Sequence, residues 1–157
     1  MQKSRRRNSC RGFSLMELLI VIAIILIILT IAVPKFNKQM MHTHEMAAIR
    51  ETQTILQAET QYYSTYGRFA QNLIELGPPA SGADSQASAN LIPKSLADGK
   101  HSGYLYTLAG TPTGYNITAV PETFGGSGGR TFFADQTFVI RNNFTAEPAT
   151  ANSPEIR

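Results

Sequence analysis

The chain has 157 residues, a formal net charge of +3 at neutral pH and a single cysteine, Cys10. This length sets one folded domain as the prior, and one cysteine excludes both an intrachain disulfide and a cysteine-based metal site. Five of the 14 basic residues lie within residues 1–12, which leaves nine basic against 11 acidic residues in the remainder. The remainder offers no basic patch, so no nucleic-acid partner is predicted.

Residues 1–12 are polar and basic and end in Gly12. A secretory signal has its small-residue cleavage site after the apolar region, whereas Gly12 comes before it. Cleavage after Gly12 would therefore keep the apolar segment in the mature protein. A basic flank ahead of an apolar span also favours a cytoplasmic N-terminus. We expect residues 1–12 to be a leader peptide that is removed on maturation.

Residues 13–33 form an apolar run of 21 residues with one charge, Glu17. A helix of that length would span about 31 Å, which is enough to cross the core of a bilayer. Many of these residues are β-branched, but a bilayer enforces internal hydrogen bonding and so favours a helix. Pro34 follows and lacks a backbone donor, so we expect a kink near Thr30 rather than a helix end.

Residues 35–66 contain neither glycine nor proline and predict a continuation of this helix. Gly67 is expected to cap its end. Apolar side chains at three- and four-residue steps predict one buried stripe: Met40, Ala47, Ala48, Ile55, Leu56, Ala58, Tyr62, Tyr63 and Tyr66. The solvent side is assigned to the polar residues between them: Lys38, Glu45, Arg50, Glu51 and Gln53. A helix over 13–66 would be about 81 Å long, so its N-terminal half needs an environment other than a small domain.

The period of the apolar pattern changes from helical to alternating after the loop at residues 78–90. Alternation and turn signals predict an antiparallel sheet of four short strands: 103–109, 115–120, 131–134 and 137–141. One face of that sheet needs a cover, which the apolar stripe over residues 47–66 can provide. The predicted fold class is α+β, with a long N-terminal helix packed on a four-stranded antiparallel sheet.

Four segments are therefore predicted along the chain. A leader over residues 1–12 precedes the long helix over 13–66, whose first part spans the membrane. A globular head over 67–141 follows. Residues 142–157 have little apolar surface to bury, so they are expected to be a flexible tail.

The sequence Gly12-Phe-Ser-Leu-Met-Glu17-Leu-Leu-Ile-Val-Ile-Ala-Ile-Ile, followed by Pro34, resembles the N-terminus of type IV prepilins and of the pseudopilins of type II secretion. The resemblance covers residues 12–34. It is specific because its parts are independent: a basic leader, glycine before the cut, phenylalanine after it, glutamate four residues on, an unbroken apolar run and a final proline. The predicted head also looks like that of this family.

The resemblance implies that a prepilin peptidase cuts between Gly12 and Phe13 and methylates the new amine of Phe13. The protein would wait in the bacterial inner membrane as a single-pass protein with a cytoplasmic N-terminus. An assembly ATPase and a platform protein would then drive its addition to an extracellular or periplasmic helical filament of the same or other pilin or pseudopilin subunits. Apolar helices would form the filament core, and the sheets its outer surface.

Glu17 has two interpretations once Phe13 becomes the N-terminus. Residues four apart share a helix face, so the Glu17 carboxylate could pair with the Phe13 ammonium of its own chain. Alternatively, Glu17 meets the ammonium of a neighbouring subunit in an apolar core, where a wrong axial register would leave both charges unpaired. The surrounding motif favours the second interpretation, in which Glu17 and Pro34 act in assembly.

Two features depart from the family pattern. Leu26 stands where many members have a glycine that favours local unwinding together with the proline. Many members also close a C-terminal loop with a disulfide or bind calcium there, but this chain lacks the cysteines and a calcium-loop spacing among its C-terminal acids. Neither a metal nor a cofactor is predicted.

The sequence contains no Ser/His/Asp set, paired carboxylates or metal cluster, so no enzymatic activity is predicted. Two other functions remain open. The chain could be a membrane-anchored extracytoplasmic binding domain that does not polymerise, or a secreted protein with an ordinary signal. The state of the mature N-terminus distinguishes these from a filament subunit.

Overall fold

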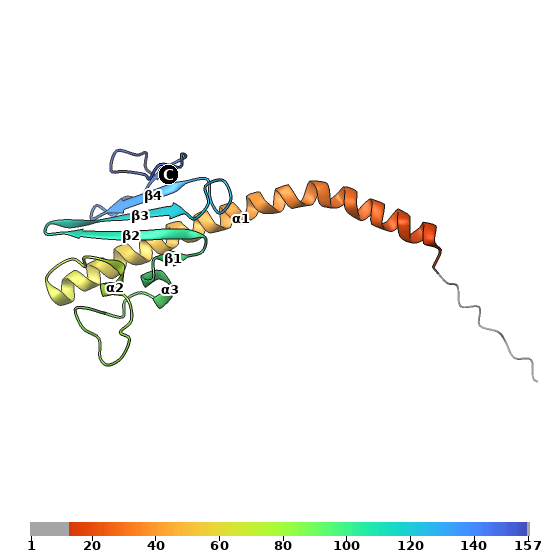
Figure 1. Ribbon diagram of the computed structural model, residues 1–157. Helices are drawn as coiled ribbons and strands as arrows, with labels where there is room; N and C mark the ends of the chain where they lie inside the picture. Colours follow the sequence, from red (N-terminus) through yellow and green to blue (C-terminus); the bar gives the residue numbers. More distant parts are fainter. Residues whose placement is uncertain (1–12, 157) are drawn as a thin grey trace, which may run out of the picture. The chain divides into compact units, whose positions relative to one another are not determined.

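A computed structural model describes residues 13–156 (Figure 1). The chain divides after Phe36 into two compact units. The predicted leader, with Gly12 and Cys10, lies outside the described residues. Helix α1 (Leu15–Tyr66) has 52 residues and runs through both units, with Pro34 inside it. The helix therefore does not end at Pro34, and the kink stays a prediction.

In the first unit, the structure consists of the start of α1. Every residue from 13 to 36 is exposed. The strongest 18-residue window of α1 has a mean hydropathy of 3.1, and none of it is buried. By length and composition, α1 is the one helix among the described residues that could cross a membrane.

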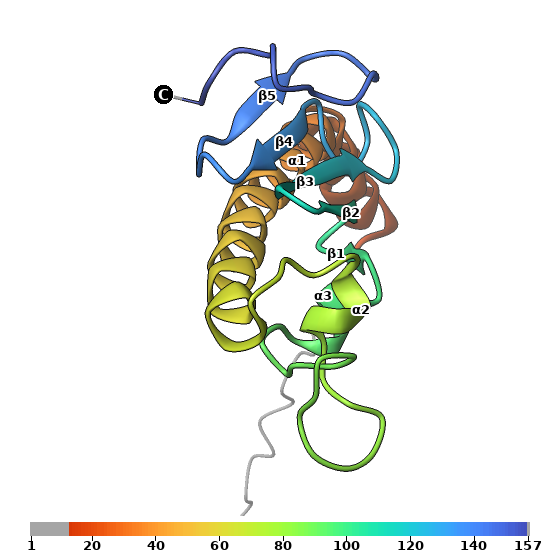
Figure 2. The same ribbon diagram turned by 90° about the vertical axis from the view of Figure 1, so that its left-hand side faces the viewer.

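In the second unit, the part of α1 from Asn37 onward packs on an antiparallel sheet (Figures 1 and 2). The strands follow one another in the order β1-β2-β3-β4-β5. Their bounds are β1 (Lys100–His101), β2 (Tyr104–Thr111), β3 (Gly114–Pro121), β4 (Thr131–Asp135) and β5 (Arg141–Asn143). Two one-turn helices, α2 (Leu73–Leu76) and α3 (Lys94–Ala97), lie between α1 and β1 in the sequence and pack against each other. The α+β, pilin-like arrangement predicted from the sequence is confirmed.

The core lies between α1 and the inward faces of β2 and β3. On β2, residues alternate between buried and exposed from Tyr104 to Leu108. Tyr62 from the helix, together with Tyr104 and Tyr115 from the sheet, supplies three of the largest fully buried side chains. The helix ends as predicted, because Gly67 adopts φ +72° and donates its N–H to the Tyr63 carbonyl at 2.8 Å.

The sheet has five strands rather than the four predicted. The expected strand over residues 137–141 is wrong, because Phe138 adopts φ +64° and pairing with β4 starts only at Arg141. The Asp135 carboxylate accepts the Thr137 N–H at 2.9 Å and closes a side-chain turn there. The additional strand β1 has only two residues, which is too short to show an alternating pattern.

The apolar stripe of α1 is present in part, because Met40 and Tyr63 are exposed, and two of the polar residues assigned to solvent were misplaced. Ala48, Ile55 and Tyr62 are fully buried. Glu45 and Glu51, which the sequence assigned to the solvent side, instead turn toward the sheet and its loops. Each has a partner there, described below, which offsets the loss of water around a carboxylate.

Residues 142–156 make more contacts than a flexible tail would. Asn142 pairs with Phe132 as part of β5, and its N–H donates to the Pro154 carbonyl at 2.9 Å. Ile156 donates its N–H to the Ile140 carbonyl at 3.0 Å, and Ala149 is 2% exposed. Backbone pairing along a sheet edge needs few apolar side chains, so the polar composition did not reveal it.

Gly110, near the β2–β3 turn, is where this sheet touches the segment that follows α1. A Cβ added there would lie 2.2 Å from the Ala70 carbonyl oxygen. We expect Gly110→Ala to destabilise the second unit by about 1–3 kcal/mol through overpacking. Thermal unfolding of the full chain in detergent, followed by circular dichroism, measures this effect. Thr113→Ala, an exposed change in the same hairpin, is the control and should leave the midpoint within about 2 °C.

Candidate processing and assembly segment

The first turn of α1 is held by Ser14 and Glu17. The Leu18 N–H donates to the Ser14 carbonyl at 3.2 Å, which marks Ser14 as the N-cap residue. Glu17 reaches back, and its Oε2 accepts the Ser14 N–H at 3.4 Å. This is one half of a capping box, for which Ser-x-x-Glu is the sequence signature. Ser14 was missed by the sequence reasoning although that signature is present.

Glu17 is thus brought together with Ser14 in its own chain. Phe13, one residue earlier, has 81% of its surface exposed. Gly12, the other side of the predicted cut, lies outside the described residues. The carboxylate therefore folds back toward the site at which the mature chain would begin.

Pro34 removes one backbone hydrogen bond from the middle of α1. Without a proline N–H, the carbonyl of Thr30 has no i→i+4 donor. The Thr30 hydroxyl donates to the Ile27 carbonyl at 2.7 Å, which adds a contact one turn before the proline. Pro34 is thus accommodated within the helix, and any role in assembly is a proposal.

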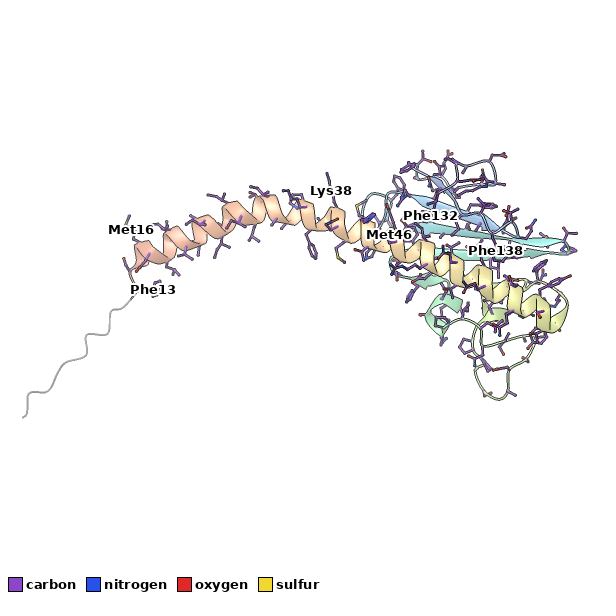
Figure 3. The ribbon with its side chains drawn as sticks, turned by 180° about the vertical axis from the view of Figure 1, so that it is seen from behind. Phe13, Met16, Lys38, Met46, Phe132 and Phe138 are labelled. Atoms are coloured by element: carbon purple, nitrogen blue, oxygen red, sulfur yellow. The ribbon has the colours of Figure 1, made fainter. Side chains whose placement is uncertain are left out.

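The helix around these residues is apolar on all sides. Figure 3 shows side chains along both edges of α1 between Phe13 and Lys38, and every residue from 13 to 36 is exposed. A helix without a hydrophilic side is typical of a membrane span or of a helix surrounded by protein. Exposed large apolar side chains occur along α1 throughout residues 15–36: Leu15, Met16, Leu18, Leu19, Ile20, Val21, Ile22, Ile24, Ile25, Leu26, Ile27, Ile28, Leu29, Ile31, Val33 and Phe36.

In the second unit, Glu45 of α1 forms a two-oxygen contact with the loop before β4. Its Oε1 accepts the Gly129 N–H at 2.9 Å, and its Oε2 accepts from Arg130 Nε at 2.9 Å. Arg130 Nη2 also lies 2.9 Å from Oε2, and both side chains are largely buried. The Arg130 guanidinium in turn lies over the Phe132 ring at 5.5 Å. These contacts attach the loop to the helix.

Glu51, less than two turns further along α1, contacts the β1–β2 turn. Its Oε1 accepts from the Ser102 hydroxyl at 3.0 Å and contacts His101 Nδ1. Ser102 and Gly103 both have positive φ values, as a tight hairpin turn requires. Burial raises the pKa of the nearby Tyr106 phenol well above its usual value, and Glu51 contributes to this shift. The Ser102 hydroxyl and the Glu51 carboxylate both contact Nδ1 of His101. In a catalytic triad the nucleophile and the acid contact opposite ring nitrogens of the histidine, so these three residues do not form one.

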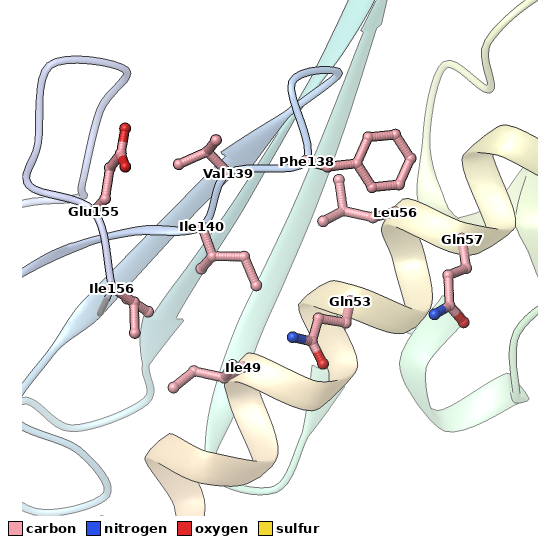
Figure 4. Close-up of a pocket in the computed structure, with 9 residues that line it drawn as sticks. All are labelled: Ile49, Gln53, Leu56, Gln57, Phe138, Val139, Ile140, Glu155 and Ile156. Carbon is pink, nitrogen blue, oxygen red and sulfur yellow. The ribbon is translucent and has the colours of Figure 1, made fainter.

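The second unit has an open groove of about 650 Å³ between α1 and the C-terminal segment (Figure 4). Its lining is mostly apolar, with two glutamine amides and one carboxylate: Ile49, Gln53, Leu56, Gln57, Phe138, Val139, Ile140, Glu155 and Ile156. Among residues 13–156, no group of three or more His, Cys, Asp or Glu is placed to hold a metal ion.

Comparison with known families agrees with the geometry of the first unit. The model of the prokaryotic N-terminal methylation motif matches residues 7–33, which is the type IV prepilin-like signal. The resemblance drawn from Gly12, Phe13 and Glu17 is therefore confirmed, and the chain is pilin- or pseudopilin-like at its N-terminus. The match ends at residue 33, so it does not extend into the second unit. No curated protein matches the chain significantly.

The Glu45–Arg130 pair gives a test of what holds the second unit together. Arg130→Ala leaves the Glu45 carboxylate buried with only the Gly129 N–H, so we expect a loss of about 3 kcal/mol of unfolding free energy. Lys94→Ala removes an exposed ion pair with Asp98 and should cost less than about 1 kcal/mol. Denaturant unfolding of the two variants in detergent compares them. Equal losses would show that Glu45–Arg130 has no special role.

Proposed function

We propose that the protein is a structural subunit of a type IV pilus or a type II secretion pseudopilus. The observation that carries this proposal is the apolar, exposed start of α1, which lies within the methylation motif matched over residues 7–33. A plain membrane anchor needs the apolar helix but not the motif. A filament subunit needs both, because processing releases the helix end that packs among other subunits.

Maturation would divide the chain at the Gly12–Phe13 bond. Prepilin peptidase would remove residues 1–12 and methylate the amine of Phe13. Residues 13–66 would then be the long helix, with 13–33 in the membrane, and the remainder would form the head. This order is supported by the position of the motif relative to α1, which begins at Leu15.

Assembly would use Glu17 as one half of a charge pair. A carboxylate has two oxygens and can accept several hydrogen bonds. Oε2 already accepts the Ser14 N–H within the chain. Oε1 could at the same time accept from the Phe13 ammonium of a neighbouring subunit. In an apolar filament core, an axial offset of one helical turn would leave both charges unpaired, so the pair would select one register.

The second unit would then lie on the outside of the filament. Its core is complete without the first unit, since α1 from Asn37 onward and the sheet bury each other. The inner membrane would hold the subunit before assembly, with its N-terminus in the cytoplasm. An assembly ATPase and a platform protein would drive its transfer into the filament, and the other subunits would be identical or related chains.

The mature N-terminus tests this proposal most directly. Mass spectrometry of the membrane-extracted protein should find a chain that starts with N-methylated Phe13. Replacement of Gly12 by leucine should leave full-length precursor, whereas Ala109→Ser in the head should be processed normally. An intact N-terminus in the unmodified protein would instead indicate a membrane-anchored domain, and loss of the whole apolar segment would indicate an ordinary secretory signal.

Two substitutions at Glu17 separate its cap from its charge. Glu17→Gln keeps an oxygen that can accept the Ser14 N–H but removes the negative charge, whereas Glu17→Ala removes both. If the charge sets the register, both variants should reduce filament incorporation at least about ten-fold in a strain that also carries the unmodified gene. Asp98→Asn, on the surface of the head, is the control. Normal incorporation of Glu17→Gln would contradict the charge-pair role.

A further inference from the structure

Glu59 is a carboxylic acid inside the core of the second unit. It lies on the sheet-facing side of α1 and has none of its surface exposed. Its Oε2 accepts the Ala70 N–H at 3.1 Å. Its Oε1 is buried and has no hydrogen-bond partner among the described residues. A carboxylate in this position would leave half of its charge without compensation, which is costly in a core.

The charged groups around Glu59 supply only part of that compensation, because the Arg68 charge lowers the pKa of Glu59 less than burial raises it. Arg68, in the turn after α1, forms its ion pair with Glu75 of α2 at 2.9 Å instead. Glu75 carries the same charge as Glu59 and opposes its ionisation. Tyr115 of β3 is 2% exposed, and its hydroxyl also lacks a hydrogen-bond partner. Burial, followed by the Glu59 charge, raises the pKa of Tyr115 to about 12.

Burial likewise raises the pKa of Glu59 from its ordinary 4.5 to about 7, against the opposing hydrogen bond from Ala70. Near neutral pH the group therefore exchanges a proton while the chain stays folded. A neutral carboxyl removes the buried charge.

Ala70 is the centre of the turn that links α1 to α2. Gln71 in this turn accepts the Gly110 N–H at 3.3 Å, which connects the turn to the end of β2. The Phe69 ring packs on Tyr63 at 4.6 Å and on Tyr115 at 5.1 Å between ring centres. These aromatic side chains line a small, mostly apolar hollow of about 200 Å³ on the surface. The turn is thus a wall of that hollow.

We propose that Glu59 is a proton-controlled latch for the turn at residues 67–72. With its proton, the side chain carries no buried charge, and the turn stays packed against Tyr115 and the β2–β3 turn. Without the proton, the buried negative charge favours states in which the turn opens and water reaches Glu59. The aromatic hollow then changes shape with pH. This inference concerns the head alone and does not depend on filament assembly.

The sign of the effect follows from proton binding. Between the ordinary pKa of 4.5 and the folded value of about 7, the closed state holds a proton that the open state has lost. The closed state is therefore favoured at low pH and is progressively weakened as the pH rises through 7. Above that range both states are ionised, and the penalty is constant.

Hydrogen exchange of the full chain in detergent micelles tests the latch. After correction for intrinsic exchange rates, protection of amides 67–72 should fall on the order of ten-fold between pH 5.5 and pH 8. Glu59→Gln keeps an oxygen for the Ala70 N–H but cannot ionise, so its protection should be the same at both pH values. Glu122→Gln, an acid paired on the surface with Lys100, should behave as the unmodified chain.

Two results would overturn the proposal. One is equal protection of residues 67–72 at both pH values in the unmodified chain. The other is a Glu59→Gln variant that keeps the pH dependence. If Glu59→Gln does not fold, carboxyl NMR titration of the unmodified chain decides the matter: a midpoint near 7 supports the latch, and a midpoint near 4.5 contradicts it.

Discussion

The start of α1 has no hydrophilic side and therefore requires an apolar environment. This requirement governs the rest of the molecule. At roughly 25 cal/mol per Å² of apolar surface, sixteen large exposed side chains represent a strong drive out of water. Among the residues that the structure describes, no other element covers these side chains, since every residue from 13 to 36 is exposed. A bilayer or a bundle of identical helices satisfies the same need. A protein that moves between those two environments exchanges one apolar surrounding for another, so transfer need not involve passage through water.

The head is organised by the same helix through polar contacts placed along its buried face. Glu45, Glu51 and Glu59 each reach a different loop: the segment before β4, the β1–β2 turn and the turn after α1. Glu45 and Glu59 are about four helical turns apart and share one side of the helix, whereas Glu51 lies about 120° around the helix from Glu45. Loops that contribute little apolar surface are thereby fixed to the most regular element of the domain. In a head whose described residues contain no cysteine, these contacts provide cross-links between distant parts of the chain.

The sequence predicted those features that depend on periodicity. The apolar helix, its extension to Tyr66, the glycine cap and the antiparallel sheet each depend on a local pattern, and the structure contains them. The processing motif was readable because its parts occupy fixed positions. The number of strands could not be predicted from the sequence. Strand β1 has only two residues, and Phe138 interrupts an apparently alternating run with a left-handed backbone conformation. Glu45 and Glu51 were misplaced for a related reason. Whether a carboxylate can enter a core depends on partners such as Arg130 and Ser102, which lie far away in the sequence.

The capping contact between Ser14 and Glu17 has an electrostatic consequence for a chain cut after Gly12. Helix α1 would start two residues from the new terminus, so the ammonium and the positive end of the helix dipole would occupy nearly the same place. A helix N-terminus corresponds to about half a positive elementary charge. Together with one ammonium it outweighs the single carboxylate of Glu17. The mature end would therefore stay net positive even when Glu17 pairs with it, and it would attract the carboxylate of a second chain rather than repel it.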